Sequence, residues 1–314
     1  MKKIYLISLV LSLMLIAFTG CSAPVSDEAD GNDEGKLQIV STIFPGYDFA
    51  KNITGENAKL SILLPPGSES HSFEPSPQDI IKIQNADLFI YVGGESDEWV
   101  NTILESMDKK VNTLKMMDAV ALFEEEAVEG AKSGDGHEDE YDEHVWTSPE
   151  NAIKISQEIA KNLSGIDPSN GSIYEENLKI YMEKLSKLDN DFRKFFSTVE
   201  NKTIIFGDRF PLLYFAKEYD LEHYSAFPGC SDGSEPSAAT IAFLMDKIKS
   251  ENIGTVFYIE FSNHKIADIL AESAGTKTAM FHSCHNVSKE EIENGSTYIS
   301  LMEQNLETLK GAMK

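Results

Sequence analysis

Short apolar runs alternate with amphipathic stretches through the first half of the chain. Residues 37–42, 59–64 and 87–92 are six-residue runs rich in aliphatic side chains, and each is followed within a few residues by Pro or Gly. This pattern predicts buried β-strands that end in turns. The intervening stretches, which end near Ile53 and Ala86, have helical spacing, and residues 116–122 are expected to return to the same sheet. Strands separated by helices favour a parallel sheet covered on both faces.

The second half repeats this outline. Strands are predicted at residues 203–206, 255–259 and 278–281, with helices at residues 211–219 and 238–250. The tripeptide Glu-Pro-Ser precedes a helix and then a strand in each half, at residues 74–76 and 235–237. Two similar α/β lobes, each with a mainly parallel sheet flanked by helices, are the simplest interpretation. Ligands of open α/β sheets bind beyond the carboxyl ends of the strands.

Two helices are predicted between the halves. Ser148-Pro149 is a start signal for a helix that runs to about Leu163. Residues 172–199 have apolar side chains at intervals of three and four with no Gly or Pro, so they predict a helix about 40 Å long that joins the lobes. The expected domains are an N-terminal lobe at residues 36–171, a connecting helix at 172–199 and a C-terminal lobe at 200–314.

The first residues have the features of an export signal. Basic Lys2 and Lys3 precede an apolar run at residues 4–18, and Phe18-Thr19-Gly20-Cys21 resembles a bacterial lipobox with an unusual Phe. We expect a signal peptide at residues 1–20, a lipid on Cys21 and a flexible tether at residues 21–35. An uncleaved membrane anchor is the alternative. In both cases the globular part lies at the extracytoplasmic face of the cell membrane.

Composition argues against nucleic acid as a partner. The chain has 52 acidic and 27 basic residues, a net charge of −25, and loss of Lys2 and Lys3 with the signal peptide lowers it to −27. Such a surface repels phosphates and concentrates cations. Residues 124–143 hold ten carboxylates and His137. We interpret this stretch as a mobile solvated insertion, in preference to a weak cation-collecting loop.

Four histidines follow predicted strands or precede a helix cap: His71, His144, His282 and His285. Neutral imidazole is a preferred ligand of zinc and manganese, and carboxylates can complete the shell. These positions therefore predict a transition-metal site at the strand ends, with Trp146 as a candidate wall. We expect His223 and His264 to lie on the surface without a role.

Several motifs together resemble the solute-binding lipoproteins of zinc and manganese ABC importers, the cluster A-I or zinc-uptake family. They spread over nearly the whole mature chain and comprise IVSTIFPGYDFA (39–50), HSFEPSP (71–77), ADLFIYVG (86–93), HVWTSPEN (144–151), the EPS that ends residues 229–237, and TYISLMEQNLETL (297–309). The resemblance implies two lobes joined by a long rigid helix. It also implies that a metal bound between the lobes is delivered to a membrane permease.

The resemblance implies His71 and His144 as metal ligands from the first lobe. The family's third histidine is replaced here by Asp208 next to Arg209, and its fourth ligand falls in the altered stretch Phe281-His282-Ser283-Cys284-His285-Asn286. The second lobe is then expected to supply His285 and Asp208, with His282, Cys230, Cys284 and Glu235 as alternates. Glu235 could equally serve the helix start at Pro236.

The two cysteines of the second lobe leave two alternatives open. As thiolates, Cys230 and Cys284 would favour Zn²⁺, whereas as a disulfide they would join two loops and could not be ligands. The remaining histidines and Asp208 would still suit Zn²⁺ or Mn²⁺ in that case.

The expected function is that of a monomeric, lipid-anchored and non-enzymatic protein that captures Zn²⁺, or next Mn²⁺, for an ABC permease. Metal affinity is expected to fall as the pH drops through about 6.5, because His must be neutral to bind. An extracellular metallohydrolase and an adhesion lipoprotein with an incidental metal are the alternatives. The chain has no HExxH or GxSxG motif for the first of these.

Overall fold

The computed structural model describes residues 35–69, 72–126, 141–227, 229 and 235–313. The chain divides into Met1–Lys36 and one compact unit, Leu37–Lys314, to which the fold below belongs. The predicted signal peptide, Cys21, nearly all of the tether, and residues 127–140 of the acidic stretch lie outside the described residues. Across the described ranges, no helix has both the length and the apolar character needed to cross a bilayer.

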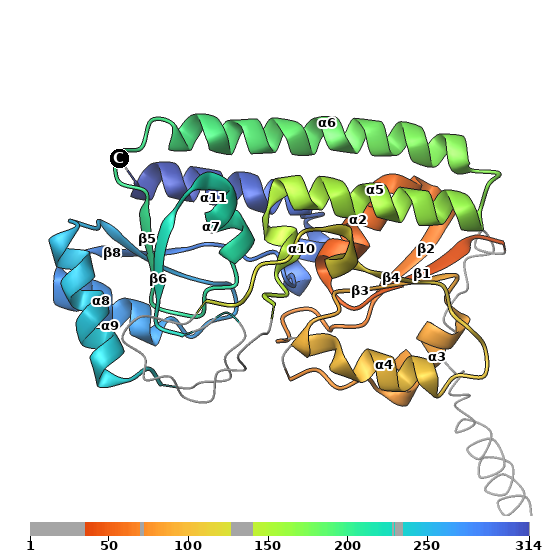
Figure 1. Ribbon diagram of the computed structural model, residues 1–314, viewed down its shortest axis with the longest axis horizontal. Coiled ribbons are helices and arrows are strands. Elements are labelled where there is room, and N and C mark those ends of the chain that lie inside the picture. Colours follow the sequence, from red (N-terminus) through yellow and green to blue (C-terminus); the bar gives the residue numbers. More distant parts are fainter. Residues whose placement is uncertain (1–34, 70–71, 127–140, 228, 230–234, 314) are drawn as a thin grey trace, which may run out of the picture. The chain divides into compact units, whose positions relative to one another are not determined.

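The first lobe is built on a four-stranded parallel sheet with the order β2-β1-β3-β4 (Figure 1). Its strands are β1 (Leu37–Ser41), β2 (Ala58–Ile62), β3 (Leu88–Tyr91) and β4 (Thr113–Lys115). The three strands predicted from six-residue apolar runs are therefore confirmed. Parallel strands buried on both faces are expected to be continuously apolar, and β3 (LFIY) has this character.

The strand predicted at residues 116–122 is wrong. The structure places β4 just before it, and Met116–Ala119 form the 3₁₀-helix η3. Met116 and Met117 are buried in the core, so their apolar character reflects burial in a turn and not pairing in a sheet.

The second lobe repeats the topology of the first with the order β6-β5-β7-β8, again all parallel. The strands are β5 (Thr203–Phe206), β6 (Glu222–Ser225), β7 (Thr255–Tyr258) and β8 (Lys277–Met280). The sequence analysis missed β6 because an edge strand with the sequence EHYS has no apolar run. The corresponding strand orders confirm the prediction of two similar α/β lobes.

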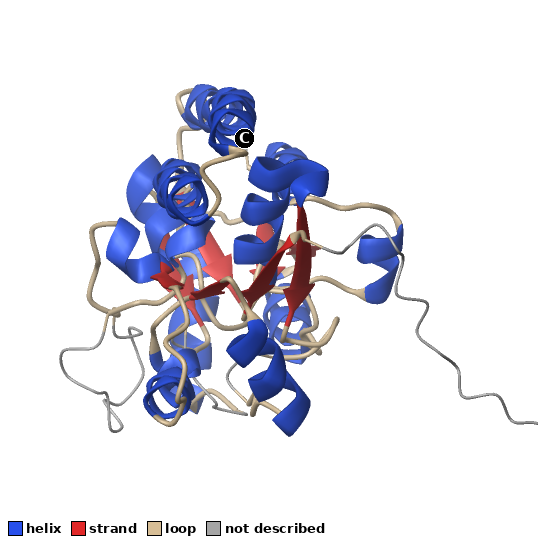
Figure 2. Ribbon diagram, turned by 90° about the vertical axis from the view of Figure 1, so that its right-hand side faces the viewer, coloured by secondary structure: helices blue, strands red, loops and turns tan. Residues whose placement is uncertain are grey.

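Helices cover both faces of the sheets (Figure 2). Ser76 and Ser148 cap α3 and α5, and in both helices Pro occupies the first turn, where it costs no hydrogen bond. The α-helices are α2 (Phe44–Thr54), α3 (Pro77–Asn85), α4 (Glu98–Glu105), α5 (Pro149–Ile166), α6 (Gly171–Phe196), α7 (Leu213–Tyr219), α8 (Ala238–Ser250), α9 (Lys265–Ala274), α10 (Lys289–Glu293) and α11 (Tyr298–Ala312). The other 3₁₀-helices are η1 (Gly55–Asn57), η2 (Glu95–Asp97) and η4 (Val145–Thr147).

Helix α6 is the long helix that the periodicity predicts. It has 26 residues and runs above both sheets, with α5 and α11 packed beneath it (Figure 1). Its buried face carries Tyr181, Leu185, Leu188 and Phe192 at intervals of three and four residues. Because α6 contacts elements of both lobes, it links them along one side of the unit.

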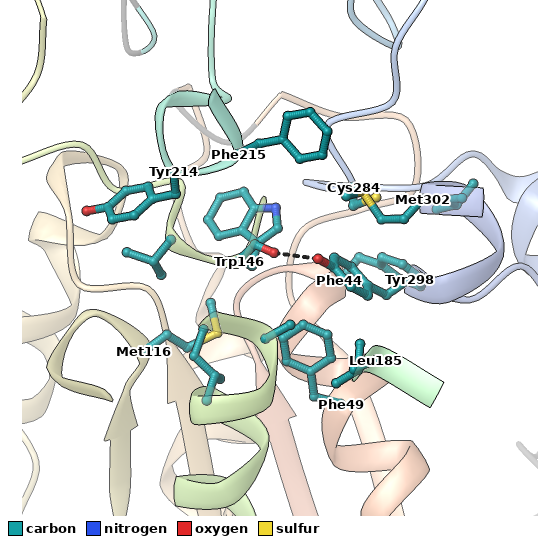
Figure 3. Packing of buried hydrophobic residues seen from close by; sticks show 14 of the residues in the cluster. Phe44, Phe49, Met116, Trp146, Leu185, Tyr214, Phe215, Cys284, Tyr298 and Met302 are labelled. Carbon is teal, nitrogen blue, oxygen red and sulfur yellow. Dashed lines mark hydrogen bonds between the residues drawn. The ribbon is translucent and has the colours of Figure 1, made fainter. Parts of the chain in front are cut away.

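The two lobes share one hydrophobic cluster. Phe49 of α2 packs edge-on against Tyr298 of α11, with 5.1 Å between the ring centroids, and both lie close to Leu185 (Figure 3). The Tyr298 hydroxyl donates a 2.8 Å hydrogen bond to the carbonyl of Trp146, so a residue near the C-terminus fixes a turn of the first lobe. This shared core explains why Leu37–Lys314 forms a single compact unit.

A buried carboxylate joins the ends of two central strands in the first lobe. Asp97 Oδ2 accepts hydrogen bonds from the backbone N–H groups of Val92 (2.6 Å) and Gly93 (3.2 Å) after β3, and from Thr42 Oγ1 (3.4 Å) after β1. Burial, together with repulsion from Glu143, raises the pKa of Asp97 from 3.8 to about 7, although these hydrogen bonds oppose the shift.

Leu185→Ala should destabilise the fold by about 2–5 kcal/mol, because it removes a fully buried side chain from the shared core. Ile180→Ala, on the same helix, is the matched control, since Ile180 is 46% exposed. Its effect should stay below about 1 kcal/mol. Urea unfolding of both variants measures the difference, and equal losses would contradict the assignment of the buried face.

Asp97→Asn should reduce the dependence of stability on pH between about pH 4 and pH 7. The raised pKa of Asp97 means that the folded chain holds this proton more tightly than the unfolded chain, so the wild type gains stability as the pH falls through this window. The free energy of unfolding at pH 5 and pH 8 tests this. Asp108→Asn, at an exposed position, should retain the wild-type pH dependence.

Candidate metal site

His144 lies in a buried turn between the acidic stretch and α5. The residue is 0% exposed, and its backbone N–H donates to Asp142 Oδ1 at 2.8 Å. The ring atom Nδ1 lies 3.3 Å from the same oxygen. A carboxylate beside Nδ1 favours the tautomer with the proton on that atom, so Nε2 is the nitrogen suited to bind a cation.

Carboxylates surround this histidine. Burial by itself lowers the pKa of His144, but Asp142, with Glu143 and Glu125, outweighs burial and raises it. Glu143 accepts hydrogen bonds from the backbone N–H (3.0 Å) and the hydroxyl of Ser96. The turn thus combines a buried imidazole with a negative environment that favours a bound cation.

His285 lies in a loop of the second lobe, residues 281–287, which follows β8. Glu260 holds this loop from behind, because its carboxylate accepts the Ser283 N–H at 2.7 Å and the Ser283 hydroxyl at 2.5 Å. The Ser283 hydroxyl also accepts the N–H of His285 at 3.2 Å. Asn305 of α11 exchanges two hydrogen bonds with the backbone of His282, at 2.7 and 2.8 Å. The position of His285 is therefore set by buried polar contacts on both sides.

The structure brings His144 and His285 together at one small pocket. Their ring centroids lie 6.1 Å apart with an interplanar angle of 82°, and the Trp146 ring lies 5.4 Å from the first and 5.1 Å from the second. The space amounts to about 20 Å³, which suits a single ion or water and no organic molecule. The described residues that line it are Ser68, Glu69, His144, Arg209, Pro211, Gly229, Ile259, Glu260, Phe261, Ser283, His285 and Asn286.

Two predicted ligands, His71 and Cys230, lie outside the described residues. Within the described ranges, no three His, Cys, Asp or Glu side chains gather in the geometry of a metal site. His144 and His285 are the two predicted ligands that these ranges bring to the pocket.

The structure gives Asp208 a different environment from the one expected of a ligand. Its carboxylate accepts the backbone N–H groups of Arg209 at 2.8 Å and Ile259 at 3.4 Å, and it is not among the pocket-lining residues. Asp208 is 8% exposed and ties the end of β5 to the end of β7.

The alternates also have other contacts. His282 is 2% exposed, accepts the Cys284 N–H on Nδ1 at 2.9 Å, and has Nε2 3.4 Å from Glu291. Cys284 is a buried free thiol whose Sγ lies 3.8 Å from the His282 carbonyl oxygen. Cys230, its partner in the disulfide alternative, lies outside the described residues. Glu235 is exposed, and the cap of α8 is Ser237.

Two further sequence expectations concern packing. His223 was expected on the surface, but this prediction is wrong, because its ring stacks on Phe210 with 4.2 Å between centroids and its side chain is 16% exposed. His223 belongs to the missed strand β6, which explains the error. Trp146 is 0% exposed and packs beside both pocket histidines, in agreement with its expected place next to His144.

Sequence reasoning missed Glu260. The residue comes two positions after β7 and reaches the pocket from the carboxyl end of that strand. The same strand-end rule that selected the histidines would have found it. Its burial, 6% exposed, becomes evident only from the packing of the 281–287 loop over it.

Comparisons with known proteins agree with this geometry. Residues 39–312 match the family described as "Zinc-uptake complex component A periplasmic". The chain is 35% identical to the zinc-binding lipoprotein AdcA of Streptococcus pneumoniae over 99% of its own length, and it spans 61% of that protein. It is also 35% identical to the high-affinity zinc uptake system protein ZnuA of Bacillus subtilis, covering 96% of this chain and 94% of that one.

A solved structure has the same fold. The Zn(II)-bound ZnuA-like domain of Streptococcus pneumoniae AdcA superimposes with a TM-score of 0.74 at 33% identity, over 88% of this chain and 99% of that one. These matches favour neither the hydrolase nor the adhesion alternative. The chain therefore belongs to the zinc-uptake complex component A family, whose members are solute-binding proteins of zinc transport and not enzymes.

Proposed function

We propose that this protein captures a divalent transition metal, zinc first and manganese next, in the pocket between its lobes and delivers it to an ABC permease. The observation that carries the proposal is the meeting of His144 from the first lobe and His285 from the second at a pocket of ionic size. The names of the AdcA and ZnuA relatives, which specify zinc, point to the same cargo.

The spacing of the two imidazoles supports binding to one ion. Zn–N bonds of about 2 Å place a ring centre about 3 Å from the metal, so two rings that bind one tetrahedral ion lie about 5 Å apart. The observed 6.1 Å is about 1 Å longer, so the rings would approach each other by about this distance on binding one ion. Asp142 behind His144 is the kind of partner that orients a metal-binding histidine.

We propose His71, His144 and His285 as the nitrogen ligands. Glu260 lines the pocket, and one of its oxygens is the proposed oxygen ligand, in exchange for a hydrogen bond to Ser283, with Cys230 as the alternate from the second lobe. Asp208, His282, Cys284 and Glu235 are less suited to ligate, because none of them is among the described residues that line the pocket. Three imidazoles and a carboxylate or thiolate form a tetrahedral set that suits Zn²⁺.

His144→Ala and His285→Ala should each weaken zinc binding by more than about 100-fold, since loss of even an outer partner of a ligand costs about 10–100-fold. Isothermal titration calorimetry with zinc competed by a chelator measures this. His264→Ala is the matched control, because the His264 ring is half-exposed, its Nδ1 lies 2.9 Å from Asp268, and the residue is not among those described as lining the pocket. Wild-type affinity in both pocket variants would reject the proposed site.

We further propose that the protein is a monomer attached to the extracytoplasmic face of the membrane through a lipid on Cys21. The lipobox-like sequence before Cys21 and the lipoprotein designation of the AdcA relative support this. The domain division at residues 36–171, 172–199 and 200–314 is part of the same proposal, with α6 as the connecting element.

Cys21→Ser should release the protein from the membrane fraction of an expressing cell and abolish incorporation of labelled fatty acid, because the acylated thiol is lost. Cys284→Ser provides the matched control, as Cys284 is buried and should not carry lipid. Fatty-acid labelling that persists in Cys21→Ser would contradict the proposed anchor.

A further inference from the structure

One wall of the pocket is a first-lobe segment that the second lobe holds in place. This segment, residues 65–69, follows β2 and has no place in a helix or strand. Ser68 and Glu69 line the pocket. Backbone N–H and C=O groups outside helices and strands still need hydrogen-bond partners. In this segment most of those partners belong to the second lobe.

Asn286 provides the most buried of these contacts. It is 3% exposed, and its amide nitrogen donates to the carbonyl oxygens of Pro65 at 2.7 Å and Ser68 at 2.9 Å. Its own oxygen accepts the N–H of Val287 at 2.8 Å, which orients the amide. The backbone N–H of Gly67 donates to the Val287 carbonyl at 3.0 Å. Both hydrogens of one side chain are thus used to hold the segment across the lobe boundary.

An ion pair completes the attachment. Arg209 Nη2 lies 2.5 Å from Glu69 Oε2, with side chains 19% and 41% exposed. Among the described residues that line the pocket, Arg209 carries the permanent positive charge. A cation there opposes a bound metal ion, and the Glu69 carboxylate neutralises it. The pair therefore removes an electrostatic penalty and fastens the same segment.

We propose that Asn286 and the Glu69–Arg209 pair are positioning residues that hold segment 65–69 against the pocket and so slow the release of the bound metal. This inference rests on the proposed metal-binding function. None of the three side chains is assigned as a ligand. Because contacts that hold a bound state together act mainly on dissociation, their loss should raise the rate of metal release more than it changes the rate of capture.

Asn286→Leu is the sharpest single test. The variant keeps the approximate volume of the side chain and adds no charge beside the metal, but it removes both donated hydrogen bonds and the acceptor of the Val287 N–H. Zinc release into excess chelator, followed by stopped flow, should become at least about 10-fold faster, since each lost hydrogen bond is worth about 1 kcal/mol. Capture of zinc should change by less than about 3-fold.

Mutating Glu69 alone should affect zinc release more than mutating both residues of the ion pair. Glu69→Gln leaves Arg209 uncompensated beside the metal and should speed zinc release about 5-fold, at the upper end for a partly exposed pair. Adding Arg209→Gln should recover part of this loss, because the repelling charge is then gone. A pair that merely stabilises the fold would give no such recovery.

Controls separate this inference from the proposed function. Glu307→Gln breaks an exposed Lys310–Glu307 pair of 2.7 Å on α11 and should release zinc at the wild-type rate. Thermal unfolding of the metal-free variants shows whether each is folded, and Glu69→Gln remains as the test if Asn286→Leu does not fold. Unchanged release from both variants, in a protein whose wild type binds zinc tightly, would overturn the positioning role. A wild type that binds no zinc would overturn the proposed function itself.

Discussion

Three hydrogen bonds from the first lobe end on carbonyl oxygens of one loop in the second, and the pocket is built around that loop. The donors are the backbone N–H groups of Phe44 and Gly67 and the indole Nε1 of Trp146, and the acceptors lie between Ser283 and Val287. Buried carbonyl groups need partners, and here the first lobe supplies them. The two lobes therefore meet through directional contacts, in addition to the apolar cluster beneath α6.

The same loop has a backbone conformation that local sequence does not favour. Cys284 has a φ of +60°, in the left-handed region, which costs a residue other than Gly about 1–2 kcal/mol. Glu260 and Asn305 hold the residues before it on two sides. Such a conformation persists only where its surroundings impose it. Because the loop is already held in one conformation, His285 loses little conformational freedom when it binds a metal ion. This favours affinity.

Each lobe also pairs one buried carboxylate with one buried histidine. In the first lobe Asp142 lies 3.3 Å from His144, and in the second Glu260 lies 3.7 Å from His282. In the first pair, His144 lines the pocket. In the second pair, Glu260 holds the loop that carries His285. With a net charge of −25 over the whole chain, the pocket lies in a field that favours cations. The positive charge of Arg209 opposes this field, and its ion pair with Glu69 neutralises that charge.

The sequence by itself determined the elements that depend on local pattern. These include six strands from their apolar runs, the long helix α6 from its periodicity, the Ser148 cap with Pro149 in the first turn of α5, and His144 from its place before a helix start. Only the tertiary structure decided which polar side chains reach the pocket. Asp208 is taken up by nearby backbone N–H groups, whereas Glu260 meets Ser283 across 23 residues and Glu69 meets Arg209 across 140. The physical reason is that periodicity reports the environment of a residue along its own element, while the direction of a side chain at a strand end depends on partners that only folding brings near.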